Sequence, residues 1–528
     1  MKPITSSSYT FSKLRETGTL YVDKTAFIHR LVTTQPKGIF FLARPRRFGK
    51  SLALSTFKSV FQGRRDLFKG LAIDSLEYEW KTHPVIHLDM TLCADTTAEK
   101  VRRRLLNTVN REAKTHGVEV SGDASDERFQ SLIETLAERD GPVVILIDEY
   151  DRPVLENIND IPNAVEIRDE LRKFYGVTKI TESLQHFLFI TGVASFAKVS
   201  FFSELNHVMQ LSQHPAYATM FGYTQEELEK NFSEYIDLAA SKRNVSRAEF
   251  LAEFKIWYNG YRFEGNAPTV YNPVSVAQFF EYGMKFQPFW VETGSSKILV
   301  EIARNQSLDF SEEISQPLRA STLNQFTVEN VNVLPLLFQS GYFTIKESEE
   351  KMGKTYYRIG FPNFEVETSF EQNLLNLYLP GAREEKIDNC AERMHAALAS
   401  RNYAAVISEL NAQLAFIPGK LHEQSEAYYH SVAAMALRYS GAAVRIEEWV
   451  STGIIDNTVT VGDLVYVFEF KIDKTAAAAL AQIHRNNYAA KWRGTGKKII
   501  LFAIAFDTEK KCVSDYKVEE QLETGLVE

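Results

Sequence analysis

The stretch that decides the fold runs from residue 38 to residue 61 and reads GIFFLA-RPRRFGKS-LALSTFKSVF. Its first part is an apolar run long enough for a buried strand, and its last part has the apolar spacing of a helix. Between them, Gly49, Lys50 and Ser51 close a polar link that begins at Arg44. A loop that joins a strand to the N-terminus of a helix is a setting in which main-chain N–H groups bind phosphate.

We predict that this link binds the phosphates of ATP. Lys50 would reach the β- and γ-phosphates and the Ser51 hydroxyl would ligate Mg²⁺, while the rest of the loop would surround the phosphates: Arg46, Arg47, Phe48 and Gly49. Arg44 stands where the usual GxxxxGK[ST] pattern has its first glycine. A helix N-cap beside a lysine would also explain GKS. Arg46 and Arg47 could act on the nucleotide of their own chain or of a neighbouring copy.

Two further apolar runs end in polar residues. VVILI at 143–147 ends in Asp148 and Glu149, and HFLFI at 186–190 ends in Thr191. Asp148 can hold Mg²⁺ through water, and Glu149 can polarise the attacking water. Thr191, or Ser195 shortly after it, stands where a polar side chain can sense the γ-phosphate. Turns at the ends of strands are the alternative explanation for both pairs.

The order of the segments predicts three regions, at 1–214, 215–375 and 385–528. Apolar strands that alternate with helices in the first region, including 84–90, favour a parallel sheet covered on both faces. The second region reads as a mostly helical lid with a strand at 356–361. In the third we expect helices at 387–415, 423–439 and 475–493, with strands at 443–450, 455–460, 464–470 and 498–505.

Several motifs occur together: DKTAFIHRLV at 23–32, RPRRFGKSL at 44–52, IDEYDRP at 147–153, ITGV at 190–193, FSELN at 202–206, WYNGYRF at 257–263, YNP at 271–273 and FPNFEV at 361–366. In this combination the chain resembles the bacterial AAA-ATPase-like proteins that carry a C-terminal PD-(D/E)xK domain. The resemblance covers nearly the whole chain and makes Arg44 a family trait. It implies an α/β protein with a P-loop AAA-type ATPase core, a parallel sheet and a helical lid, followed by an α/β restriction-endonuclease-like domain.

The third region carries the residues of a second predicted site. Asp456 follows GII at 453–455, and strand alternation puts Glu469 and Lys471 on one face of the strand VYVFEFK at 465–471. Asp456 and Glu469 can ligate Mg²⁺ beside a scissile phosphate, and Lys471 can help to orient or deprotonate the attacking water.

Other residues bear on whether this site is active. Glu447 or Glu448, on the preceding strand, could complete the acidic cluster, and His430 and His484 could approach it. Gln482 and Tyr488 match the QI…Y element that accompanies the motif in similar proteins, so Gln482 is added to the catalytic set. Ile454 departs from the family pattern, which usually has arginine two residues before the aspartate. An inactive nuclease fold used for binding is therefore the alternative.

Composition limits the partners. The net charge is −8 and the pI about 5.9, so the chain is no general polyanion binder and nucleic acid must meet a local basic surface. The segment 471–506 has seven Lys and Arg and one acid, which suits DNA at the third region. The run Arg102–Arg104 reads instead as an exposed helix face. Three scattered cysteines, no signal peptide and no apolar run of membrane-spanning length predict a cytoplasmic protein.

These observations lead to three hypotheses. The first is an ATP-dependent enzyme in which the nucleotide state controls a Mg²⁺-dependent nuclease acting on DNA, with a role in defence against foreign DNA by analogy alone. The second is a nucleotide-switched binding protein whose nuclease-like domain is inactive. The third is an ATPase that uses that domain mainly as an interface between copies of the chain.

Overall fold

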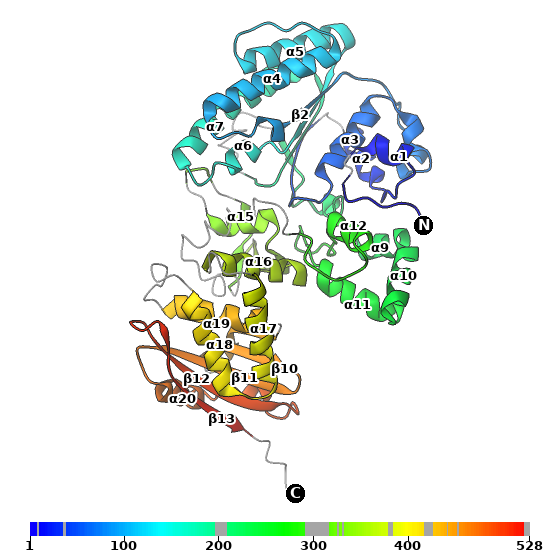
Figure 1. Ribbon diagram of the computed structural model, residues 1–528. Helices are drawn as coiled ribbons and strands as arrows, with labels where there is room; N and C mark the ends of the chain where they lie inside the picture. The colour runs from blue at the N-terminus through cyan, green and yellow to red at the C-terminus, as the bar shows by residue number, and fades with distance from the viewer. Residues whose placement is uncertain are drawn as a thin grey trace. The chain divides into compact units, whose positions relative to one another are not determined.

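The computed structural model (Figure 1) describes residues 1–7, 10–34, 38–195, 208–290, 316–324, 327–329, 332–378, 384–416, 426–440, 442–450 and 453–521. The chain divides into two compact units, Met1–Gln306 with Gln316–Glu367 and Ser307–Ser315 with Thr368–Glu528. Among the helices formed by these residues, none is long and apolar enough to cross a membrane.

The first unit contains a five-stranded sheet in the order β2-β3-β4-β1-β5. Every neighbouring pair is parallel. The strands are β1 Ile39–Ala43, β2 Val85–Asp89, β3 Val143–Asp148, β4 Gln185–Gly192 and β5 Val208–Gln210. β1 and β3 are buried along their whole length, as unbroken apolar strands must be when helices cover both faces of a sheet. The predicted parallel α/β sheet is confirmed, and β5 is an additional edge strand.

Helices cover this sheet on both sides. In Figure 1, α1 Phe11–Glu16, α2 Thr25–Val32 and α3 Lys50–Phe61 lie on one side, and α4 Ala98–His116, α5 Ser125–Asp140 and α7 Ile161–Ile180 lie on the other. The short helix α6, Arg152–Leu155, follows the carboxyl end of β3. The polar link after β1 therefore leads directly into α3, as the sequence predicts.

The predicted helical lid is also confirmed. It consists of α9 Gln225–Asn231, α10 Ser233–Arg243, α11 Arg247–Tyr258 and α12 Pro273–Glu281. Aromatic side chains such as Phe250, Phe254 and Phe279 fill its core, which accounts for the high aromatic content of this region.

A small antiparallel sheet and a further helix also belong to the described part of the first unit. The helix is α15 Val333–Ser340, and the strands are β6 Leu318–Arg319, β7 Thr344–Lys351 and β8 Lys354–Gly360, in the order β6-β8-β7. We expected one strand at 356–361, but the structure has a hairpin. Met352 and Gly353 form its turn with φ of 50° and 68°, as two-residue hairpins require. β7 lacked a signal because most of its residues are charged and exposed.

The second unit places helices against a five-stranded sheet of order β13-β12-β11-β10-β9. Its helices are α16 Phe364–Tyr378, whose first four residues belong to the first unit, α17 Glu384–Ala399, α18 Tyr403–Phe416, α19 Glu426–Tyr439 and α20 Ala476–Arg485. Its strands are β9 Ala443–Val450, β10 Gly453–Val461, β11 Leu464–Ile472, β12 Lys498–Asp507 and β13 Cys512–Gln521. β11 and β12 are parallel and the other pairs antiparallel.

Two helix predictions in this unit were wrong in extent. The helix expected at 387–415 is two helices, because the chain turns between them at Arg401, whose φ is 58°. The helix expected at 475–493 ends at Arg485, since Asn487 has a φ of 46° and a short 3₁₀ helix, Tyr488–Trp492, follows. β13 was not predicted, because its charged and mostly exposed sequence lacks an apolar face.

Candidate nucleotide and nuclease sites

The link between β1 and α3 has the backbone of an anion-binding loop. Arg47 and Gly49 adopt left-handed conformations, with φ of 67° and 91°, and Gly49 is the N-cap of α3. In the described part of the chain, the N–H groups of Lys50 and Ser51 in the first helical turn donate to no acceptor. Open N–H groups and the positive end of the helix dipole favour an anion at this place.

Arg44 has a structural role in this loop. Its side chain is only 2% exposed, and its guanidinium donates to the carbonyl oxygens of Ala43 at 3.0 Å and Ser212 at 2.5 Å. It also lies 4.1 Å from the centroid of the Phe263 ring. Burial lowers the pKa of Arg44 to about 9. These contacts explain why arginine, rather than glycine, begins the loop.

Lys50 is buried beneath the loop. Its Nζ donates to the carbonyl oxygens of Arg44 at 2.9 Å and Pro45 at 3.0 Å. An ammonium has three N–H groups, so one remains for a phosphate oxygen. Burial lowers the pKa of Lys50, while the neighbouring carboxylates of Glu149 and Asp148 act in the opposite direction.

Strands β3 and β4 bring the predicted acidic and hydroxyl residues together. Asp148 ends β3, and Thr191 lies at the end of β4, where its hydroxyl donates to Asp148 Oδ1 at 2.5 Å. The same hydroxyl accepts the Glu149 N–H at 3.4 Å. The N–H of Arg44 donates to Gly192 O, so β1, β3 and β4 end at one edge of the sheet. A buried carboxylate and the Ser51 hydroxyl are ligands suited to Mg²⁺.

Glu149 is oriented by a neighbouring arginine. Its carboxylate accepts from Arg152 at 2.8 Å, and its φ of 51° turns it out of the line of the strand. Burial raises the pKa of Glu149, but the charges of Lys50, Arg152 and Arg46 outweigh burial and the net shift is downward. The group is therefore ionised at neutral pH, as an acceptor of a proton from water must be.

Asp151 was not among the predicted site residues. It is fully buried and accepts the N–H groups of Val193 at 3.0 Å and Ala194 at 2.6 Å, so it fixes the chain that leaves β4. Burial raises its pKa to about 6. Its position in the motif IDEYDRP could have marked Asp151 as a site residue. The sequence does not show, however, which of the acids in this motif points into the protein.

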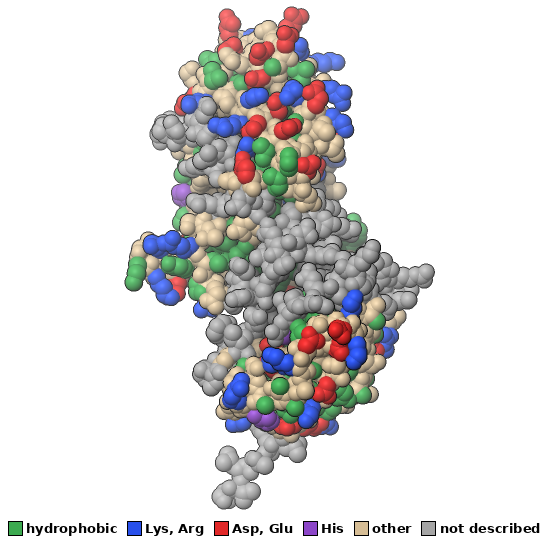
Figure 2. All heavy atoms as spheres, turned by 90° about the vertical axis from the view of Figure 1, so that its left-hand side faces the viewer, with side chains coloured by type: hydrophobic (Ala, Val, Ile, Leu, Met, Phe, Trp, Pro, Cys, Tyr) green, Lys and Arg blue, Asp and Glu red, His purple; other side chains and the backbone are tan. Residues whose placement is uncertain are grey.

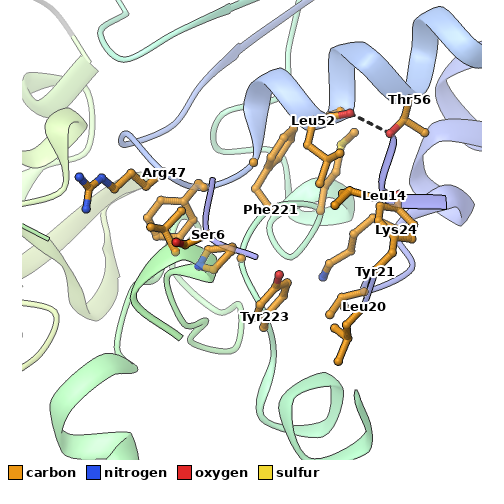
Figure 3. Close-up of a pocket in the computed structure, with 18 of the residues that line it drawn as sticks. Ser6, Leu14, Leu20, Tyr21, Lys24, Arg47, Leu52, Thr56, Phe221 and Tyr223 are labelled. Carbon is orange, nitrogen blue, oxygen red and sulfur yellow. Dashed lines mark hydrogen bonds between the residues drawn. The ribbon is translucent and has the colours of Figure 1, made fainter. Parts of the chain in front are cut away.

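The remaining loop residues point in different directions. Arg46 lies near the acids, since Glu149, Asp151 and Glu156 all act on its charge. Arg47 instead donates to Phe289 O at 2.7 Å, and Figure 3 shows its guanidinium directed away from the neighbouring cavity. The Phe48 ring packs edge-on against Tyr261, with centroids 4.8 Å apart, so only its main chain is available to a phosphate. Tyr261 belongs to the WYNGYRF motif, so this contact packs that motif against the loop.

A cavity of about 120 Å³ adjoins the loop. Its walls come from the N-terminal segment, the start of α3, the chain before α9 and the start of α12: Leu14, Leu20, Val22, Ile28, Gly49, Leu52, Ala53, Met220, Phe221 and Pro273. Tyr21, Lys24, Thr56 and Tyr223 supply polar groups, and Figure 3 shows the Lys24 ammonium and the Tyr223 hydroxyl pointing inward. Burial raises the pKa of both tyrosines, so both hydroxyls remain donors.

Lys24 joins two walls of this cavity. Its Nζ lies 2.6 Å from Glu227 Oε1 on α9 and 2.7 Å from the carbonyl oxygen of Thr219. Mostly apolar walls with a few polar groups are typical of sites for planar ring ligands. The sequence did not reveal this cavity, because its residues come from segments about 200 positions apart.

The second unit brings three predicted residues together. Asp456 Oδ2 accepts the N–H of Phe470 at 2.6 Å, which holds β10 beside Glu469 and Lys471 on β11. Glu469 is fully buried, and its Oε1 lies 2.8 Å from Lys471 Nζ. His430 of α19 approaches the same point, with Nε2 3.8 Å from Asp456 Oδ2.

The donor set in this unit fits Mg²⁺ rather than a metal held wholly by protein. No cluster of three or more acid, His or Cys side chains suited to a metal occurs among the described residues. Mg²⁺ is usually held by one or two carboxylates together with water and substrate phosphates, which Asp456 and Glu469 can satisfy.

The other predicted residues make contacts of their own. Gln482 lies half-buried on α20. Its main-chain carbonyl oxygen accepts a hydrogen bond from the N–H of Asn486. The Tyr488 hydroxyl accepts from Asn486 Nδ2 at 2.9 Å. The Ser195 N–H donates to Gln339 Oε1 at 2.5 Å. The FSELN motif and the side chains of Glu447, Glu448 and Ile454 lie outside the described residues.

Charges on the described surface are mixed in sign. Arg102 pairs with Glu99 and Glu170, and Arg104 pairs with Asp95, as expected for an exposed helix face. In the second unit, His484 lies 2.7 Å from Glu519 rather than at the acidic cluster. Figure 2 shows acidic and basic side chains intermixed over the face that it draws.

Comparison with known proteins finds matches to both regions of the chain. Residues 5–202 match the model of a family described as predicted AAA-ATPase, AAA-ATPase-like, and residues 424–516 match the PD-(D/E)XK nuclease superfamily. A protein of Azotobacter chroococcum mcd 1, described as an uncharacterized protein in the vnfD 5' region, is 33% identical over 523 residues, 97% of each chain. The chain belongs to the AAA-ATPase-like family.

Two solved structures resemble this AAA-ATPase-like protein at lower levels. Cdc6p from Pyrobaculum aerophilum shows 13% identity with a TM-score of 0.26, covering 66% of this chain and 93% of its own. The Aeropyrum pernix Orc1 protein in complex with DNA shows 14% identity with a TM-score of 0.24, covering 66% and 92%.

The two matched ranges of the AAA-ATPase-like protein contain the residues of both candidate sites. The range 5–202 contains the loop at 44–51 together with Asp148, Glu149 and Thr191, and the range 424–516 contains Asp456, Glu469, Lys471 and Gln482. The predicted fold class, an AAA-type ATPase core with a helical lid and a C-terminal PD-(D/E)XK domain, is confirmed.

Proposed function

We propose that the first unit binds ATP with Mg²⁺ and hydrolyses it, and that its nucleotide state controls a Mg²⁺-dependent nuclease in the second unit. The observation that carries the first half is the meeting of Lys50, Asp148, Glu149 and Thr191 at one edge of the parallel sheet. Phosphoryl transfer needs little more than such positioning and charge, because the protein supplies no covalent chemistry.

Each residue of this site has a separate role in the proposed reaction. Lys50 and the N–H groups of the loop bind the phosphates, and Ser51 and Asp148 hold Mg²⁺. The metal, when bound, neutralises charge that develops on the phosphates. Thr191 fixes the direction of the Asp148 carboxylate. Glu149, kept ionised by Lys50 and Arg152, accepts a proton from the attacking water.

The cavity beside Gly49 takes the adenine ring in this proposal. Its apolar walls suit the faces of a purine, and Tyr21, Thr56 and Tyr223 offer hydrogen bonds to ring nitrogens. We therefore expect ATP to bind more tightly than a pyrimidine triphosphate, because only a purine fills the cavity beside the loop.

Binding and turnover of ATP by the full chain test this half. Lys50→Ala should abolish ATP binding, whereas Glu149→Gln should retain binding and lose hydrolysis, since it removes only the proton acceptor. Wild-type affinity in Lys50→Ala would exclude the proposed phosphate site. Unchanged turnover in Glu149→Gln would exclude Glu149 as the base.

For the second unit, Asp456 and Glu469 hold Mg²⁺ and Lys471 orients the attacking water, with Gln482 on the adjacent helix α20. Support comes from the buried contact of Glu469 with Lys471 and from the Asp456 bond to the adjoining strand. We propose DNA as the substrate. Mg²⁺-dependent cleavage of plasmid or single-stranded DNA should be lost in Lys471→Ala. Lys510→Ala, at an exposed position outside the basic segment 471–506, is the matched control.

A second candidate function uses the same fold without cleavage. Ile454 occupies the position where the family usually has arginine, which favours a nuclease-like domain that binds nucleic acid but does not cut it. DNA binding by wild type without cleavage in Mg²⁺ or Mn²⁺ would support this candidate and overturn the nuclease.

The wider setting is proposed as well. We propose that the three regions 1–214, 215–375 and 385–528 are the ATPase core, the lid and the nuclease-like domain, and that the protein works in the cytoplasm as a homo-oligomer. Defence against foreign DNA is the role that the two activities together suggest.

A further inference from the structure

Three sequence motifs have no part in the two sites, yet the structure gathers them around the phosphate-binding loop. They are WYNGYRF at 257–263, YNP at 271–273 and FPNFEV at 361–366. Tyr261 packs on Phe48, and Asn272 Nδ2 lies 3.5 Å from the carbonyl oxygen of Arg46. A Cβ added at Gly260 would lie 1.9 Å from Pro362 O, so the first and third motifs touch backbone to backbone.

The third motif holds a buried carboxyl group, that of Glu365. Its side chain is fully buried, and Oε1 accepts the N–H groups of Phe289 at 2.8 Å and Trp290 at 2.9 Å. Burial raises the pKa of Glu365 to about 8, so the group is largely protonated at neutral pH. A side chain that receives two main-chain N–H groups fixes the position of the peptide that carries them.

The same peptide is held from the other side by the phosphate-binding loop. Arg47 donates to the carbonyl oxygen of Phe289 at 2.7 Å. Arg47 has a left-handed φ of 67°, and Figure 3 shows its guanidinium directed away from the cavity. A continuous chain of hydrogen bonds thus runs from Arg47 through residues 289–290 to Glu365.

Glu365 is the second residue of α16, which continues from the first unit into the second. Asn363 caps this helix by accepting the N–H of Val366 at 3.0 Å. The contacts that start at the phosphate-binding loop therefore end at the first turn of α16, and the same helix continues into the second unit. Hydrogen-bonded chains of this kind transmit coupling when the element at their end has two arrangements.

We propose that Glu365 is a positioning residue that couples the phosphate-binding loop, through Arg47 and residues 289–290, to the first turn of α16. The inference rests on the proposed ATP binding and adds the route by which nucleotide occupancy reaches the second unit. Neither site explains why an acid is buried at position 365, and this route gives that acid a role.

Amide hydrogen exchange of the full chain tests the route, with ATP affinity measured on the same samples. In wild type, Mg²⁺-ATP should slow exchange at the start of α16 at least threefold. Glu365→Ala should lose this response while binding ATP within about tenfold of wild type. Glu365→Gln should keep it, because the amide oxygen still accepts both N–H groups.

Two further variants make the result decisive. Arg47→Ala breaks the route at its other end and should also lose the effect of ATP on exchange at α16. The route can therefore be tested even if Glu365→Ala misfolds. Glu367→Gln changes a carboxylate in the same turn that acts on Lys346, and should respond as wild type does. A response that survives in both Glu365→Ala and Arg47→Ala overturns the route. Wild type that binds ATP without a response at α16 also overturns it, whereas no ATP binding at all refutes the proposed function itself.

Discussion

Replacing Thr191 by valine removes the hydroxyl that donates to Asp148 while keeping the shape of the side chain. The two residues are 0% and 5% exposed, and the hydrogen bond is 2.5 Å long. A hydrogen bond to a charged group contributes about 1.5–3 kcal/mol, and water cannot replace the donor at a buried site. We therefore expect the free energy of unfolding to fall by about 1.5–3 kcal/mol.

The same substitution should impair turnover. An Asp148 carboxylate without its donor is free to rotate away from Mg²⁺, and 1.5–3 kcal/mol corresponds to a factor of roughly 10–150 in rate if it is lost in the transition state. ATP hydrolysis and urea denaturation of the full chain measure the two effects. Each should appear without loss of secondary structure.

Thr191→Ser separates the hydroxyl from the methyl group. It keeps the donor and deletes one buried methyl, which costs about 1 kcal/mol of stability but should leave turnover near wild type. The reasoning is refuted if Thr191→Val hydrolyses ATP as fast as wild type, or if Thr191→Ser loses activity to the same extent as valine.

Two other predictions concern the cavity and Glu365. Lys24→Met should weaken ATP binding about tenfold and destabilise the first unit by about 1–2 kcal/mol, because Glu227 loses its partner. Isothermal titration measures the ATP affinity, and an unchanged affinity would exclude Lys24 from the site. The pKa of Glu365 is raised to about 8 in the folded protein, whereas in the unfolded chain this carboxyl group has its ordinary pKa of 4.5. Between these two pH values the folded protein keeps a proton that the unfolded chain has lost. The free energy of unfolding of wild type should thus fall relative to Glu365→Gln as pH rises from 5 to 8.5, by at most about 4 kcal/mol; urea denaturation across this range checks it, and a constant difference would contradict it.

Local patterns made the ends of the strands predictable. β1, β3 and β4 each contain an apolar run, so the polar residues that follow these runs, Lys50, Asp148 and Thr191, could be assigned to one edge of a parallel sheet. Strand alternation likewise put Glu469 and Lys471 on one face, and the structure brings them to 2.8 Å. In both cases the pattern of apolar and polar residues within single strands was enough to predict which side chains lie together.

Contacts between distant segments were not predictable. The cavity joins Tyr21 and Lys24 to residues near 220, and Glu365 meets a peptide 75 positions earlier. Such contacts depend on tertiary packing, which leaves no periodic signal in either segment. The break at Arg401 was missed for a related reason, because a single left-handed residue interrupts two helices of similar composition.

The central claim is that nucleotide state controls DNA cleavage, and a single cleavage experiment tests it. Plasmid DNA is incubated in Mg²⁺ with wild type, Lys50→Ala and Lys471→Ala, each with and without ATP. The account predicts that ATP changes the cleavage rate of wild type at least fivefold, that Lys50→Ala cleaves at an ATP-independent rate, and that Lys471→Ala does not cleave. Cleavage by wild type that is the same with and without ATP, and the same in Lys50→Ala, would contradict it.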